Sequence, residues 1–132
     1  GGLNQDLGFS DTDRMENIRR VSEVAKTLVS NGLVVIVSLI TPKKEFRESA
    51  KKIIGSDSFR EIYIQADFET CLKRDVKGLY AKAEKNEIKD FTGKSSSFEI
   101  PMDPWVSIDT ASETISKSSQ TLFSKILKDV QI

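Results

Sequence analysis

Apolar residues recur every three or four positions near the amino end of the chain, which is the pattern of a helix with one buried face. The positions concerned are Met15, Ile18, Val21, Ala25 and Leu28. Ser10 has the side chain of an N-cap, and Asn31–Gly32 can end a helix in the left-handed conformation. We therefore predict a helix from about residue 11 to residue 30.

A different pattern follows this helix. Residues 33–40 read LVVIVSLI, a continuous apolar run rich in β-branched side chains. Such a run is typical of a strand that is buried on both faces in a parallel sheet. Residues 59–66 alternate between apolar and polar positions and predict a second strand, and residues 105–109 predict a third.

Helical segments separate these strands. After Thr41–Pro42 we expect a charged helix to about residue 54, then helices over residues 68–74 and 111–130. This alternation predicts an α/β fold, in which helices flank a parallel sheet within one domain over residues 1–132. Ligands of such sheets bind beyond the carboxyl ends of the strands. Residues 41, 66–67 and 109–110 should then lie near any site.

The composition limits the possible functions. Twenty basic and twenty acidic side chains cancel, so the net charge gives no support to binding of nucleic acid or of a membrane surface. No apolar run reaches the roughly 20 residues of a membrane span. The chain has no histidine and one cysteine, which excludes a Ser-His-Asp triad and zinc sites made of His or Cys ligands. A metal would have to be a hard ion such as Mg²⁺, and the lone Cys71 favours a cytoplasmic location.

Two short segments carry side chains suited to a ligand, and each has an ordinary structural alternative. Phe9, Arg14 and Asn17 could stack a base and hold an anion, or they could belong to a charged helix with a hydrophobic staple. Thr41, followed by Pro42 and two lysines, could meet a phosphate at a helix start or could simply cap the helix.

The third segment runs from residue 74 to residue 101. It combines lysines, glycines and serines with Tyr80, Phe91 and Phe98. Long connections without secondary structure are uncommon unless they are functional. Residues 77–101 could form a lid over a charged ligand, or a solvated surface excursion. The 132 residues contain neither G-x-x-x-x-G-K-[ST] nor G-x-G-x-x-G.

In their order and spacing, the stretches GLNQDLGFSDTDRMENIRR, GLVVIVSLITP and RDVKGLYAKAEKNEIKDFTG resemble the adenylylsulfate kinase (APS kinase) family. The resemblance covers essentially the whole chain. It implies a P-loop kinase fold and a cytoplasmic homodimer. It also implies transfer of the γ-phosphate of ATP, with Mg²⁺, to the 3′-hydroxyl of adenosine 5′-phosphosulfate (APS). In the family a strand and a Walker A phosphate loop precede the part matched here, so we expect an N-terminally incomplete copy of the fold, inactive on its own.

The resemblance also implies roles for individual residues. The positions that match substrate contacts are Phe9, Arg14, Asn17, Ile40, Lys89 and Phe91. Among them, the two phenylalanines match aromatic side chains that stack on the adenine of APS, and Ile40 matches a backbone contact. Arg74 and Thr110 lie where the family holds the adenine of ATP.

Thr41 matches a family serine that in some members carries a phosphoryl group, and it is the one candidate catalytic position. Its extra methyl group argues against a covalent role. Two alternatives to an active kinase stay open: a non-catalytic fragment that binds adenylyl nucleotides, and a dimerisation module of a larger sulfate-activating enzyme.

Overall fold

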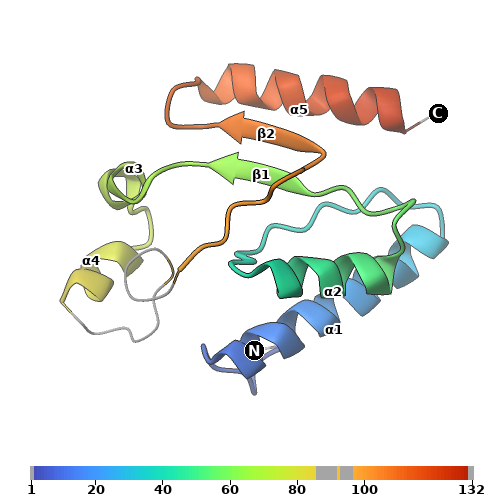
Figure 1. Cartoon of the computed structure of the whole chain (residues 1–132), viewed down its shortest axis with the longest axis horizontal. Helices are drawn as coiled ribbons and strands as arrows, with labels where there is room; N and C mark the ends of the chain where they lie inside the picture. Colours follow the sequence, from blue (N-terminus) through green and yellow to red (C-terminus); the bar gives the residue numbers. More distant parts are fainter. Residues whose placement is uncertain (1, 86–91, 93–96, 131–132) are drawn as a thin grey trace.

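A computed structural model describes residues 2–85, 92 and 97–130 of the chain. The predicted substrate contacts Lys89 and Phe91 lie outside these residues. Figure 1 shows the order of the helices and strands, which are α1 (Asp11–Ser30), α2 (Lys44–Ile54), β1 (Ile62–Gln65), α3 (Phe68–Arg74), α4 (Leu79–Glu84), β2 (Val106–Asp109) and α5 (Ile115–Asp129).

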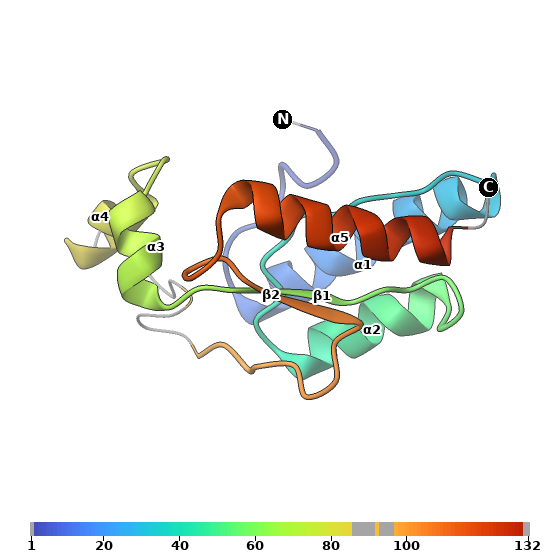
Figure 2. The ribbon, with the colours of Figure 1, turned by 90° about the horizontal axis from the view of Figure 1, so that it is seen from above.

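The sheet is parallel, as the alternation of elements predicts. β1 pairs with β2 in a register that places Ile62 opposite Val106 and Gln65 opposite Asp109. α5 and α2 lie on opposite sides of this strand pair (Figures 1 and 2). Both strands are shorter than predicted, but each lies inside its predicted range, so the α/β class is confirmed.

Helix α1 begins and ends where its local signals predict. The Ser10 hydroxyl oxygen accepts a hydrogen bond from the amide of Asp13 at 3.1 Å. At the other end Gly32 has φ 80°, a left-handed conformation that glycine adopts without strain. The apolar face packs on α2, where Ile18, Phe46 and Ala50 form a buried cluster. This small core fixes the two helices against each other.

The strand predicted over residues 33–40 is wrong. In the described part of the chain these residues form no strand, and most of their side chains are exposed, with Ile36 77% accessible and Ile40 65%. The physical reason is that a strand exists through hydrogen bonds to a neighbour, and the only strand that pairs with β1 in the described residues is β2. An apolar groove of about 440 Å³ separates residues 33–39 from β1 and the end of α5.

The start of α2 also differs from the prediction. Its N-cap is Lys43, whose side chain makes no capping hydrogen bond, so Thr41 does not cap the helix, which was one of the two alternatives for this residue. Pro42 is fully buried. The first free amide of the helix, that of Lys44, donates to a carboxylate oxygen of Glu99 at 2.6 Å. A side chain distant in sequence therefore supplies the cap, which no local pattern predicts.

Part of the segment after Arg74 is helical. Helix α4 follows Gly78, which has φ 65°, and the carboxylate of Asp75 accepts hydrogen bonds from the amides of Tyr80 and Ala81 at 3.0 and 2.9 Å. Sequence reasoning did not predict this helix. α5 begins at Ile115 instead of the predicted residue 111, because Thr114 caps it. Among the helices that the structure describes, none is long and apolar enough to cross a membrane.

Candidate functional site

The carboxyl ends of β1 and β2 are joined through Thr110. Its amide and its hydroxyl both donate to the carbonyl oxygen of Gln65, each at 3.0 Å. Arg74, the last residue of α3, donates from Nη2 to the Thr110 carbonyl at 2.5 Å and from Nη1 to its hydroxyl at 3.3 Å. The structure therefore brings the predicted pair Arg74 and Thr110 into direct contact beyond the strand ends, where ligands of parallel sheets bind.

Two carboxylates frame this end of the sheet. Asp67 caps α3 by accepting from the amide of Thr70 at 2.7 Å, and this hydrogen bond lowers the pKa of Asp67. Asp109 accepts from the Ser112 hydroxyl at 2.8 Å, which is the largest cause of its lowered pKa. Both groups are charged at neutral pH and hold local turns. Beside them, Arg74 adds a positive charge.

A second group of predicted residues lies at the start of α1. The ring of Phe9 is 70% exposed. Arg14 Nε donates to the Phe9 carbonyl at 3.0 Å, and Arg14 Nη1 donates to the Thr92 hydroxyl at 2.7 Å. Asn17 Oδ1 accepts from Asn4 Nδ2 at 2.6 Å. The start of α1 thus places Arg14 against the backbone of Phe9. Arg14 also connects α1 to Thr92, the residue that follows Phe91 in the sequence.

The third group is the segment that leads into α2. Ile40 has an exposed side chain, and the carbonyl oxygen of Thr41 accepts from Arg47 Nη1 at 2.8 Å. Among the residues described, no hydrogen bond or ion pair joins Ile40 or Thr41 to Phe9 or Asn17. The structure thus forms two of the predicted pairings, Phe9 with Arg14 and Arg74 with Thr110.

Sequence reasoning missed three residues that hold these side chains. Thr92 positions Arg14. The only feature of the sequence that could have indicated this role is the position of Thr92 directly after Phe91. Asn4 holds Asn17, but an isolated asparagine in a turn carries no signal of its own. Gln65 holds Thr110 through its backbone carbonyl, which depends on strand pairing and not on the identity of the side chain.

Helices α3 and α4 also meet through side chains. The rings of Phe68 and Tyr80 lie 5.5 Å apart between centroids. Burial, with a smaller contribution from a hydrogen bond to Cys71, raises the pKa of Tyr80 to about 12. The phenol is therefore neutral at physiological pH. No group of three or more acidic or sulfur side chains in the described ranges has the spacing of a metal site.

Comparison with known proteins agrees with these features. The family model described as adenylylsulphate kinase matches residues 1–109. The chain is 45% identical over 130 residues to the adenylyl-sulfate kinase of Bacteroides thetaiotaomicron, covering 98% of this chain and 65% of that protein. It is 46% identical over 127 residues to that of Prochlorococcus marinus, covering 96% of this chain and 63% of the relative. The chain thus spans somewhat less than two thirds of the length of these relatives.

The fold agrees as well. The structure of the Mycobacterium tuberculosis APS kinase CysC in complex with AMPPNP and APS superposes with a TM-score of 0.86 at 38% identity. That match covers 95% of this chain and 73% of the other. The parallel strand pair flanked by helices is therefore part of a P-loop kinase fold. On the family model, the curated relatives and the shared fold, this chain belongs to the adenylylsulphate kinase family.

Proposed function

We propose that this chain forms the substrate-binding part of an adenylylsulfate kinase, which transfers the γ-phosphate of ATP to the 3′-hydroxyl of APS. The observation that carries the proposal is the superposition, over 95% of the chain, on an APS kinase solved with AMPPNP and APS. The reaction needs little covalent chemistry from the protein, because phosphoryl transfer is catalysed by positioning and by charge stabilisation. By the same family relationship, we propose a homodimer in the cytoplasm.

The start of α1 offers the chemistry that APS requires. The exposed ring of Phe9 can stack on the adenine, and the charge of Arg14 can face the phosphosulfate. Hydrogen bonds to the Phe9 carbonyl and to Thr92 hold the Arg14 guanidinium against the backbone of Phe9. Asn17, Ile40, Lys89 and Phe91 complete the proposed set of substrate contacts.

ATP fits the other end of the proposed site. Arg74 is exposed and is held by two hydrogen bonds to Thr110, so it presents a planar cation beyond the strand ends, against which the adenine of ATP can lie. ATP supplies the phosphoryl group. The described residues offer no cluster of carboxylates for Mg²⁺, so we assign no step of the reaction to a metal held by this chain.

Thr41 completes the proposed site at the end of residues 33–40. We propose that its hydroxyl faces the ligand and does not carry the phosphoryl group, because threonine adds a methyl group where the family has serine. Nucleotide binding without turnover is the second candidate for the isolated chain, because its 132 residues contain no G-x-x-x-x-G-K-[ST] sequence.

Calorimetric titration of APS into the chain tests the substrate site. Phe9→Ala should weaken APS binding about 5- to 150-fold, since stacking of a base on an aromatic ring contributes roughly 1–3 kcal/mol. Phe123→Ala is the matched control, because this ring is 62% exposed on α5, away from the proposed site. Equal affinities of the wild type and Phe9→Ala would refute the stacking role.

A further inference from the structure

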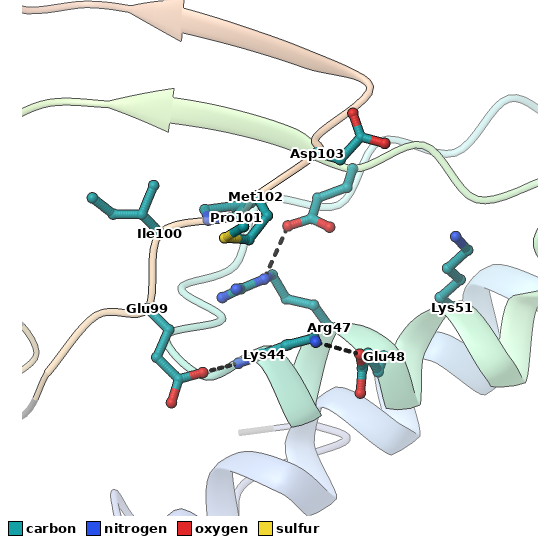
Figure 3. Close-up of a pocket in the computed structure, with 10 residues that line it drawn as sticks. Lys44, Arg47, Glu48, Lys51, Glu99, Ile100, Pro101, Met102 and Asp103 are labelled. Carbon is teal, nitrogen blue, oxygen red and sulfur yellow. Dashed lines mark hydrogen bonds and ion pairs between the residues drawn. The ribbon is translucent and has the colours of Figure 1, made fainter.

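Two segments that are distant in the sequence meet at the start of α2. Figure 3 shows Glu99 pointing at the backbone of Lys44. Glu99 Oε2 accepts from the Lys44 amide at 2.6 Å, and the Glu99 amide donates to the Pro42 carbonyl at 2.7 Å. Because Lys43 caps the helix without its side chain, Glu99 replaces the missing cap and places a negative charge at the positive end of the helix.

Arg47 makes a second set of contacts at the same place. Its side chain is only 8% exposed, and its Nε lies 2.9 Å from Glu61 Oε1. The geometry of this contact is that of an ion pair without an aligned hydrogen bond. Arg47 Nη1 donates to the Thr41 carbonyl at 2.8 Å, and its guanidinium carbon lies 5.9 Å from the centroid of the Phe98 ring. A buried arginine needs such partners, since leaving its charge unpaired is costly.

Arg47 and Glu99 hold successive peptide groups. Arg47 binds the carbonyl of Thr41, and the backbone of Glu99 binds the carbonyl of Pro42. The ring of Phe98, the residue before Glu99, stacks on Tyr63 with centroids 6.0 Å apart and faces Arg47. The backbone between Ile40 and α2 is therefore oriented by Arg47 on α2 and by residues 98–99.

We propose that Arg47 and Glu99 are positioning residues that fix the backbone of Ile40 and Thr41 for contact with the substrate. The inference rests on the proposed function, which places this backbone against APS. Neither side chain has to touch the ligand. The Arg47 side chain acts through the Thr41 carbonyl. The Glu99 side chain acts through the first amide of α2, while the backbone amide of the same residue holds the Pro42 carbonyl.

The alternative is that these contacts stabilise the fold and leave the substrate contact unaffected. The two interpretations differ in what a variant changes. Loss of a structural cap lowers the unfolding temperature and leaves the affinity of the folded protein for APS unchanged. Loss of a positioning contact weakens APS binding at temperatures where the variant is fully folded.

Three variants separate these interpretations. Glu99→Ala removes both the cap and the charge. Glu99→Gln keeps the length and an acceptor oxygen, so it is the conservative rescue even if Glu99→Ala folds poorly. Arg47→Lys keeps a charge near Glu61 but lacks the fork of donors that reaches both Glu61 and the Thr41 carbonyl. Glu48→Ala is the control, because Glu48 lies on α2 with its side chain 64% exposed and pairs with Lys44 at 3.5 Å.

The experiment combines two measurements on folded protein: APS affinity by calorimetry, and exchange of the Lys44 amide by NMR. In Glu99→Ala we expect about tenfold faster exchange at Lys44 and about tenfold weaker APS binding, with Glu99→Gln recovering most of both. Arg47→Lys should weaken APS binding without changing exchange at Lys44.

Wild-type affinity in Glu99→Ala and Arg47→Lys would overturn the inference, as would an equal loss in Glu48→Ala. Wild-type protein that does not bind APS at all would contradict the proposed function itself. The ratio of the APS affinities of variant and wild type therefore tests the positioning role. Binding of APS by the wild type tests the proposed function.

Discussion

Glu16 is held between two arginines of its own helix. Its carboxylate lies 2.7 Å from Arg19 Nε and 2.8 Å from Arg20 Nε. Arg20 also pairs with Asp6 at 2.7 Å and donates to the Leu3 carbonyl at 2.8 Å. This network ties the first turn of the chain to α1, the helix that carries Arg14 and begins just after Phe9.

Because of this network, the stability of the folded protein depends on pH in the acid range. The hydrogen bond from Arg19, followed by that from Arg20, lowers the pKa of Glu16 from 4.5 to about 2. Because the folded-state pKa lies below the unfolded value, the stabilisation is complete above about pH 4.5 and is lost as the pH falls toward 2. The urea midpoint of the wild type should fall across this window, and that of Glu16→Gln should fall less steeply.

Glu48→Gln is the control for this measurement, because Glu48 is an exposed carboxylate on α2. Its pH profile should run parallel to that of the wild type. If Glu16→Gln gives a profile as steep as the wild type, the Arg19 and Arg20 contacts do not stabilise the folded state. Because solvent reaches these charged side chains and screens their attraction, we expect only a small change in the urea midpoint.

At the scale of elements, α1 depends on its cap. The Ser10 oxygen accepts from the amide of Asp13 at 3.1 Å. Replacing Ser10 by alanine should lower the free energy of unfolding by about 1 kcal/mol, whereas glycine should cost only a few tenths. Urea denaturation followed by circular dichroism measures both.

Ser30→Ala, at the other end of the same helix, is the control and should change stability little. An equal loss in Ser10→Ala and Ser30→Ala would show that the capping hydrogen bond is not the cause. Equal effects of alanine and glycine at Ser10 would argue against a cap as well.

The elements that sequence reasoning predicted are those with local causes. α1 and α3 have the predicted limits because Ser10, Gly32 and Asp67 act on amides or turns next to them. α4 was missed because its start depends on Asp75 and on the left-handed conformation of Gly78. The strand over residues 33–40 was predicted wrongly because apolar side chains indicate burial and do not supply a hydrogen-bonding neighbour.

At the scale of the whole molecule, the site depends on contacts between residues far apart in the sequence. Arg14 reaches Thr92 across 78 positions, Lys44 reaches Glu99 across 55, and Arg74 reaches Thr110 across 36. Sequence patterns identified one partner of each pair at most, except for Arg74 and Thr110. Those two were found through the family resemblance and through the rule for strand ends, and not through periodicity.

The exposed apolar run predicts self-association of the isolated chain. Val34, Ile36 and Ile40 are each at least 60% exposed beside the apolar groove, and burying such a surface between copies is favourable. Sedimentation velocity should show association that rises with protein concentration and is reduced by Ile36→Lys. Val76→Lys is the matched control, because Val76 is 93% exposed elsewhere. A wild-type chain that stays monomeric, or an equal effect of both lysines, would contradict the expectation.

The most direct test of the account is APS-dependent release of ADP from Mg-ATP. A coupled assay measures it for the 132-residue chain and for a longer chain in which these residues follow a phosphate loop. The account predicts turnover and a 3′-phosphorylated product for the longer chain. It predicts none for the chain alone, because loss of even one preorganised donor costs about 10²–10³ in rate and the chain contains no phosphate-loop sequence. Absence of APS-dependent ADP release from the longer chain would contradict the proposed function, and full turnover by the 132 residues alone would contradict the view that they form only the substrate-binding part.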